Sequence, residues 1–188
     1  MNDQINIHTE KLTKHYGDVR DLVDLDLDVK AGEIFGFLGP NGAGKTTTIR
    51  TMLDEIRPTS GTASILGMDS HEMSVEIRNH IGYVPGDLAM YPNLTGRDTL
   101  TYFANLRGGV DWTYVDTLAE RLEADLSKKV GDLSSGNRQK VGLIQAFMNR
   151  PEVLIMDEPS SGLDPLMQRE FQMMMREVAE EGRTVFLS

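Results

Sequence analysis

The segment FLGPNGAGKTTTIR, residues 37–50, contains three glycines followed by a lysine and three threonines. Within it, residues 39–46 fit the pattern G-x-x-x-x-G-K-[ST] of a loop that binds phosphate groups. Glycines allow backbone N–H groups to approach phosphate oxygens because no Cβ stands in the way. Lys45 would bring a positive charge to the β- and γ-phosphates, and Thr46 would bring a hydroxyl to Mg²⁺. The segment therefore predicts a nucleoside triphosphate site, formed by Gly39, Pro40, Asn41, Gly42, Ala43, Gly44, Lys45, Thr46 and Thr47.

A second segment, VLIMDEP at residues 153–159, places two carboxylates directly after four apolar residues. Asp157 would hold Mg²⁺ at the carboxyl end of a strand, where open α/β sheets bind their ligands. Glu158 would polarise an attacking water as a general base. An isolated Asp-Glu pair is usually surface charge, but an apolar strand before it and a phosphate loop in the same chain favour the catalytic interpretation.

Strands must position both segments. Alternation of apolar and polar residues predicts half-exposed strands over 5–16 and 22–30. More continuous apolar runs predict buried strands over 33–38, 81–85 and 153–156. Further strands are predicted at 58–67, as a turn and an edge strand, and at 184–188. A chance glycine-rich turn is the alternative to the phosphate loop, and the strand before the loop and the helix after it disfavour that alternative.

Helices fill the remaining chain. One is predicted to begin near Lys45, and Thr95 can cap another that runs to about Leu106. Helices are also predicted around residues 115–122, from about 134–136 to before Pro151, and around 171–178 until Gly182. Helices and strands alternate on both sides of a helical block, which predicts an α/β fold with a mostly parallel sheet and a helical insertion. The methionines of the last helix are predicted to pack in the core.

Composition limits the classes of protein that fit. The chain has 188 residues, 39% hydrophobic and 26% charged, which suits one globular domain. A net charge of −10 argues against nucleic acid as a partner, since nucleic-acid binders need a basic face. The chain has no cysteine, its four histidines lack metal-ligand spacing, and no apolar run approaches the length of a membrane span.

Together these motifs resemble the ATP-binding subunit of ABC transporters, in order and over essentially the whole chain. GPNGAGKTT resembles the Walker A motif of that family, and LIMDEP resembles its Walker B motif with the catalytic glutamate, here Glu158. Tyr16 matches the aromatic residue that stacks on adenine. LSSGNRQK lies where the family has its signature, and SGLD matches its D-loop; the residues concerned are Ser134, Ser135, Gly136 and Asn137, and Ser161, Gly162, Leu163 and Asp164.

The resemblance implies one ABC-type ATP-binding domain over residues 1–188. Its P-loop NTPase (RecA-like) core, with an antiparallel β subdomain at the N-terminal side, would comprise 1–86 and 151–188, and an inserted α-helical subdomain about 87–150. ATP and Mg²⁺ are the implied cofactors, and two subunits would sandwich two ATP molecules between phosphate loop and signature. Transmembrane permease subunits are the further partners, which implies a cytoplasmic protein at the inner face of the cell membrane.

Several positions depart from the family pattern. Gly86, followed by Asp87, stands where the family has a glutamine that touches Mg²⁺ and senses the membrane domain. Either Asp87 or a water would replace that side chain, or coupling would run through the backbone. Ser135 and Asn137 replace the usual glycine and glutamine of the signature. These replacements resemble the drug and antibiotic exporter branch, and residues 87–107 are the candidate surface for the membrane partner.

The family also has a histidine after a strand like TVFLS, and this chain ends at Ser188. We therefore expect a C-terminally truncated domain that binds nucleotide but hydrolyses it weakly. Two other functions stay open: a soluble ABC-type ATPase that is not linked to transport, and a non-catalytic nucleotide-binding partner subunit. Glu158 argues against the second alternative and Gly86 argues mildly for it. A helix N-cap is an equally physical interpretation of Asp164.

Overall fold

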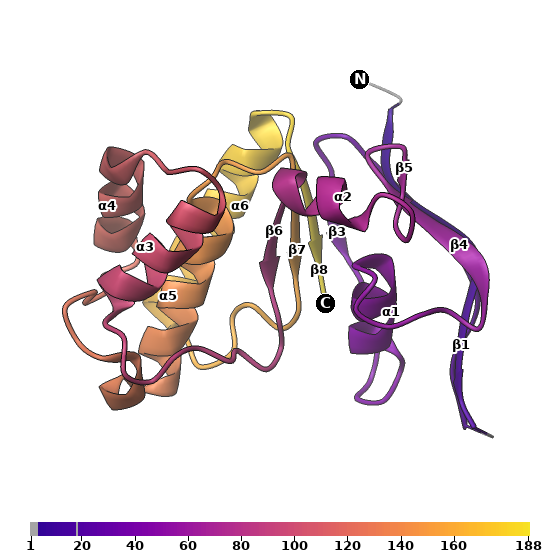
Figure 1. The fold of residues 1–188 in the computed structure, drawn as a ribbon, viewed down its shortest axis with the longest axis horizontal. Helices are drawn as coiled ribbons and strands as arrows, with labels where there is room; N and C mark the ends of the chain where they lie inside the picture. Colours follow the sequence, from indigo (N-terminus) through magenta and orange to yellow (C-terminus); the bar gives the residue numbers. More distant parts are fainter. Residues whose placement is uncertain (1–3, 18) are drawn as a thin grey trace.

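The computed structural model describes residues 4–17 and 19–188. Two sheets and six α-helices make up the described chain, and Figure 1 shows them in three groups, with the parallel strands between the helical group and the antiparallel sheet. In chain order the elements are β1 (Ile5–Tyr16), β2 (Val19–Lys30), β3 (Ile34–Gly36), α1 (Lys45–Met52), β4 (Ser60–Ile65), β5 (Met68–Asp69), α2 (Ser74–His80), β6 (Ile81–Val84), α3 (Gly96–Leu106), α4 (Trp112–Arg121), a 3₁₀ turn (Val130–Asp132), α5 (Ser135–Phe147), β7 (Val153–Met156), α6 (Pro165–Glu180) and β8 (Thr184–Leu187).

The second sheet has the order β3-β8-β7-β6, and every neighbouring pair in it is parallel. Its side chains alternate between two cores, as the pleat requires. Leu154 and Met156 pack with the buried faces of α3 to α6. Val153 and Ile155 point the other way and pack with α1, α2 and the antiparallel sheet. The predicted α/β fold with a mostly parallel sheet is therefore confirmed.

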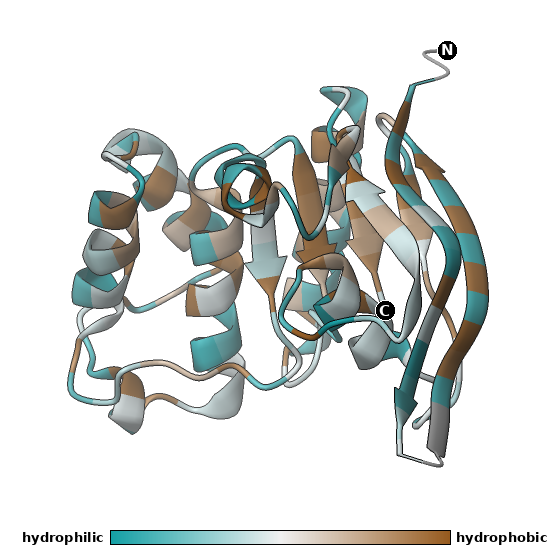
Figure 2. Cartoon of the chain, turned by 45° about the vertical axis from the view of Figure 1, so that its right-hand side comes forward, coloured by the Kyte–Doolittle hydropathy of each residue, from teal (hydrophilic) through white to brown (hydrophobic). Residues whose placement is uncertain are grey.

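The first sheet is antiparallel, with the order β2-β1-β4-β5. Figure 2 shows hydrophilic and hydrophobic bands alternating along its long strands. The strand predicted over 58–67 is present as β4, but its predicted edge position was wrong, because β5 pairs with the outer side of β4. Leu66 and Gly67 both have positive φ (55° and 74°), which makes a tight hairpin between the two strands. The second strand of that hairpin has two residues, too few to show an alternating pattern.

Most helix boundaries follow from local chemistry. Thr95 and Asp98 form a reciprocal capping box before α3, as the sequence predicted. The N-caps of α5 and α6 are Ser134 and Asp164, and Gly182 (φ 83°) follows the end of α6. Met174 and Met175 of α6 are buried in the core as expected, whereas Met173 is 47% exposed. Among the residues that the structure describes, no helix combines the length and apolar character needed to cross a membrane.

Helix α2 was not predicted. It has seven residues, only Ile77 of them is buried, and its N-cap Met73 offers no side-chain hydrogen bond. A helix this short shows neither a periodic apolar stripe nor a capping residue, so the sequence carried no pattern for it.

Candidate nucleotide-binding site

The loop between β3 and α1 has the backbone shape that its glycines permit. Gly42 and Gly44 have φ values of 80° and 77°, in the left-handed region that favours glycine. A Cβ on Gly44 would lie 2.4 Å from the carbonyl oxygen of Asp21 in β2. Gly44 must therefore lack a side chain for two independent reasons, its conformation and the close approach of β2.

Helix α1 begins at Lys45, directly after this loop, as predicted. Its N-cap Gly44 provides no side-chain hydrogen bond, and the first turn of the helix contains no acidic residue. The first N–H groups of a helix lack intrahelical partners, and the helix dipole is positive at this end. The start of α1 is therefore suited to an anion such as phosphate.

The ammonium group of Lys45 adds a full positive charge above the loop. Its Nζ donates hydrogen bonds to the carbonyl oxygens of Gly39 (2.8 Å) and Pro40 (3.1 Å). Because these are neutral acceptors, a phosphate oxygen would be a stronger partner for the same ammonium. A bound phosphate could therefore replace the two carbonyl oxygens as the acceptor of the hydrogen bonds that Lys45 donates.

Asp157 lies at the carboxyl end of β7 and is 2% exposed. Its Oδ2 accepts a hydrogen bond of 2.6 Å from the hydroxyl of Thr46, at the start of α1. Its Oδ1 accepts a hydrogen bond from the hydroxyl of Ser188, which follows β8. The two segments singled out in the sequence thus meet at one carboxylate.

Glu158 joins the same site by an unusual backbone turn. Its φ is 47°, a left-handed conformation that a non-glycine residue adopts at a cost of about 1–3 kcal/mol. At this strained turn the chain changes direction after β7, and Glu158 is exposed. A cleft of about 280 Å³ is lined by this glutamate together with Asp21, Asn41, Gly42, Gly44, Lys45, Thr46 and Thr47.

Asp21 is a lining residue of the cleft that sequence reasoning missed. It lies in β2, and its backbone reaches Gly44 only because β2 passes beside the phosphate loop. The sequence around Asp21 is that of an ordinary strand and carries no pattern that marks a cleft residue. Its place beside the cleft is evident only from the way the two sheets pack in three dimensions.

The donor set suits Mg²⁺. Thr46 offers a hydroxyl oxygen and Asp157 a carboxylate oxygen, which are the hard ligands that this ion prefers. Thr46 lines the open cleft and bonds buried Asp157, and an open cleft suits an ion that keeps waters and binds together with phosphates. Thr46 and Asp157 would hold the ion, and its positive charge would offset negative charge on the phosphates.

The signature and D-loop residues lie together. Ser134 accepts a hydrogen bond from the backbone N–H of Asn137 (3.3 Å), and Asp164 accepts from Leu166 and Met167 at the start of α6. A Cβ on Gly136 would lie 2.4 Å from the carbonyl oxygen of Gly162, so the first turn of α5 and the D-loop are in direct contact. Ser134, Ser135, Gly136 and Asn137 are not among the residues that line the phosphate-loop cleft.

Buried Gln139 connects the helix that begins at the signature to the segment after the two carboxylates. From α5 it donates a hydrogen bond of 3.0 Å to the carbonyl oxygen of Pro159, the residue after Glu158. The N-cap interpretation of Asp164 is confirmed by its hydrogen bonds, and a partner contact of the same residue stays a prediction.

Tyr16 lies at the end of β1, where it pairs with Val19 at the start of β2. Its side chain is 48% exposed, and the ammonium of Lys14 lies 5.2 Å from the centre of its ring. The ring does not line the cleft, although β2 continues from this turn to Asp21, which does. The ring is accessible to a ligand, and its stacking on adenine stays a prediction.

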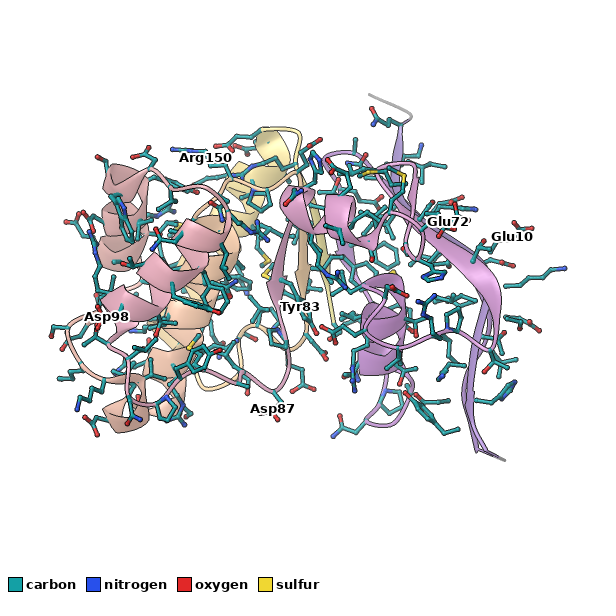
Figure 3. The ribbon with its side chains drawn as sticks, viewed as in Figure 1. Glu10, Glu72, Tyr83, Asp87, Asp98 and Arg150 are labelled. Atoms are coloured by element: carbon teal, nitrogen blue, oxygen red, sulfur yellow. The ribbon has the colours of Figure 1, made fainter. Side chains whose placement is uncertain are left out.

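Gly86 and Asp87 follow β6, next to the carboxylate site. A Cβ on Gly86 would lie 3.0 Å from Oδ2 of Asp157, so the backbone itself covers that oxygen. The side chain of Asp87 is exposed, and Figure 3 shows it in the loop that leaves β6, below Tyr83 on the strand. Neither residue is among those that line the phosphate-loop cleft.

A second hollow, which we call the β6–α3 groove, begins beside this loop and has a volume of about 330 Å³. Burial, with a smaller contribution from the charges of Glu55 and Asp157, raises the pKa of Tyr83 in this groove to about 12. Most of its lining is apolar: Leu53, Ile81, Tyr83, Pro85, Leu88, Ala89, Met90, Phe103 and Leu106, with Glu55, Arg78, Arg107 and Gln145 as polar members.

Comparison with known proteins gives consistent results. The ABC transporter family matches residues 22–161 of the chain. The chain is 39% identical over 187 residues to the probable multidrug ABC transporter ATP-binding protein YbhF of Escherichia coli (strain K12), covering 97% of the chain and 32% of that protein. It is 40% identical over 185 residues to the bacitracin transport ATP-binding protein BcrA of Bacillus licheniformis, covering 97% and 60%.

Among solved structures, the fold is similar to that of an ATP binding subunit of an ABC transporter, with a TM-score of 0.88 and 31% identity. That likeness covers 97% of this chain and 78% of the other. The chain thus spans about a third of one of the two relatives named above and 60% of the second.

Proposed function

The chain belongs to the ABC transporter family as an ATP-binding domain, and from this premise we propose that it is the ATP-hydrolysing motor of an exporter. ATP binding would join two such domains, and hydrolysis would release them, so that separate transmembrane permease subunits are driven through a transport cycle. Drugs and antibiotics are the proposed substrate class, because two relatives are named for multidrug and bacitracin transport.

One observation carries the motor function. The hydrogen bond between Thr46 and Asp157 joins the phosphate loop to the end of β7, and Glu158 lines the same cleft. A loop for phosphates, an oxygen pair for Mg²⁺ and a free carboxylate are the parts that nucleoside triphosphate hydrolysis requires. The exposed Glu158 in this cleft also disfavours a non-catalytic partner subunit.

The proposed roles follow from these positions. The start of α1 and Lys45 hold the β- and γ-phosphates, and Tyr16 stacks on adenine. Thr46 and Asp157 hold Mg²⁺, and Asp21 borders the bound phosphates. Glu158 accepts a proton from the water that attacks the γ-phosphorus, while the bond from that phosphorus to the departing ADP oxygen breaks.

A second copy, or a related subunit, would complete each site. Ser134 to Asn137 lie apart from the cleft of their own chain and are exposed or half-exposed, which supports a role toward the ATP of the partner. The D-loop, Ser161 to Asp164, touches Gly136 and would report the partner's state to Pro159 and Glu158 through Gln139. We assign residues 1–86 and 151–188 to the core with its β subdomain, and about 87–150 to the helical subdomain.

The β6–α3 groove, which the predicted surface 87–107 lines in part, is the proposed seat for the membrane partner. It is apolar and begins beside Gly86, which covers a carboxylate oxygen of the Mg²⁺ site. Movement in the groove would therefore reach Asp157 through the backbone, without the glutamine that the family usually has. This partner would place the protein at the cytoplasmic face of the membrane.

The test is the Glu158→Gln variant with ATP and Mg²⁺, followed by light scattering. Loss of the general base should slow hydrolysis by a factor on the order of 10²–10⁴ and trap an ATP-bound dimer. The matched control is Glu152→Gln, because Glu152 is an exposed glutamate just before the same strand. A Glu158→Gln variant that hydrolyses ATP at the wild-type rate, or stays monomeric with Mg-ATP, would contradict the motor function.

A further inference from the structure

Ser188 occupies a defined position next to Asp157. The parallel strands β7 and β8 pair Met156 with Leu187 in their last register position. The backbone N–H of Ser188 then donates to the carbonyl oxygen of Met156 (3.0 Å), which continues the ladder by one step. Asp157 and Ser188 are thus neighbours in register, and in-register side chains of adjacent strands point to the same face.

This register brings the Ser188 hydroxyl to the free oxygen of the Asp157 carboxylate. Ser188 donates to Oδ1, while Thr46 donates to Oδ2. The carboxyl-group torsion of an aspartate is broad, so one hydrogen bond leaves the group free to turn. Two donors, one on each oxygen, restrict this rotation, and the backbone of Gly86 lies close to Oδ2.

The order of the sheet explains why this residue is in place. β8 lies between β3, which leads into the phosphate loop, and β7, which carries Asp157. The residue at the carboxyl end of β8 is therefore central to the site, although it belongs to neither of the two segments that the sequence singled out. A hydroxyl there can donate to the carboxylate without adding a competing charge.

We propose that Ser188 is a positioning residue of the Mg²⁺ site, which orients the Asp157 carboxylate so that it can hold the ion beside the phosphates. This inference rests on the proposed function, since it assumes that Asp157 serves Mg²⁺. The backbone of Ser188 is held by strand pairing, so loss of its hydroxyl leaves the strand intact and frees only the carboxylate.

The experiment measures ATP affinity by titration calorimetry across a series of Mg²⁺ concentrations and in EDTA. Ser188→Ala should raise about tenfold the Mg²⁺ concentration at which the gain in ATP affinity is half-maximal. A tenfold change is typical for the loss of one hydrogen bond to a charged group. Affinity in EDTA and the melting temperature should stay at wild-type values. Ser188→Thr, which keeps the hydroxyl on a residue suited to strands, should restore the Mg²⁺ dependence.

Ser127→Ala is the matched control. Its hydroxyl also donates to an aspartate, Asp125 (2.6 Å), but on the exposed surface. This variant should show the wild-type Mg²⁺ dependence. A Ser188→Ala protein with unchanged Mg²⁺ dependence would overturn the inference alone, and so would equal losses with and without Mg²⁺. A wild-type chain that binds no ATP in either condition would overturn the proposed function, and the inference with it.

Discussion

The hydroxyl of Thr46 donates a hydrogen bond of 2.6 Å to Oδ2 of Asp157, although the two residues are 111 positions apart in the chain. Thr46 lies in the first turn of α1, and Asp157 follows β7, two strands away from β3 in the same sheet. This hydrogen bond connects the start of α1, directly after the phosphate loop, to the carboxyl end of β7.

Removal of the Lys45 ammonium should weaken ATP binding without unfolding the protein. Among the residues that the structure describes, the Lys45 side chain donates hydrogen bonds only to loop carbonyls, so Lys45→Ala should leave the melting temperature close to wild type. Loss of a charge-assisted bond to phosphate should lower ATP affinity by at least about tenfold in calorimetry. Lys128→Ala, which removes an exposed ion pair with Asp125, is the control. Equal affinities of the two variants would refute the role of Lys45.

Two glycines of the phosphate loop should differ sharply when changed to alanine. Gly42→Ala meets open space and only the left-handed φ, so it should cost about 1–2 kcal/mol of unfolding free energy. Gly44→Ala has the same φ penalty and also a Cβ 2.4 Å from the carbonyl oxygen of Asp21, so it should cost clearly more. Urea unfolding of both variants measures the difference. Equal losses would mean that β2 can move away from the added Cβ without loss of unfolding free energy.

A charge placed in the β6–α3 groove should prevent the membrane partner from binding there. Leu106 lines this groove and is 66% exposed, so Leu106→Glu should leave ATP affinity intact. The same change should abolish stimulation of ATP hydrolysis by the permease in vesicles, because a buried unpaired carboxylate is costly at an interface. Val75→Glu changes a similarly exposed residue (74%) outside the groove and should keep the stimulation. A Leu106→Glu protein that is stimulated normally would exclude the groove.

The stability of the fold should depend on pH through His80. Hydrogen bonds to Glu152 (2.8 Å) and Glu76 (3.2 Å) raise the pKa of His80 above 6.5. The protonated ring therefore stabilises the folded state fully below about pH 6.5, and this contribution disappears as the pH rises through the folded-state pKa. Since the ring is partly exposed, we expect no more than about 1 kcal/mol.

Urea unfolding at a series of pH values would measure this contribution. His80→Gln should remove the loss of stability with rising pH, and Glu152→Gln should reduce it, because Glu152 is the largest cause of the raised pKa. A His80→Gln protein with the wild-type pH profile would show that the hydrogen bonds do not bias the protonation of the ring.

Local patterns were sufficient for much of the fold. Periodicity and caps predicted the strands of the parallel sheet and α3 to α6, and the spacing from Gly39 to Thr46 predicted the loop before α1. These features depend on neighbours a few residues away. The two-residue β5 and the short α2 were missed because neither is long enough to form a period.

The site was predictable only where one segment carries its own pattern. The phosphate loop and the Asp157–Glu158 pair were found in this way. Asp21 and Ser188 were not, because their places depend on how strands from distant parts of the chain pair and pack. An apolar run predicts that a strand exists, but it does not give the register that sets Ser188 beside Asp157.

Calorimetric titration with ATP and Mg²⁺ tests the central claim most directly, namely that the loop ahead of Lys45 wraps the phosphates of ATP while Asp157 holds the metal ion. Wild type should show saturable binding that weakens when Mg²⁺ is chelated. Asp157→Asn should lose that Mg²⁺ dependence, because a neutral amide is a weaker partner for the ion. A flat wild-type titration, or an Asp157→Asn variant with the wild-type Mg²⁺ dependence, would contradict the account.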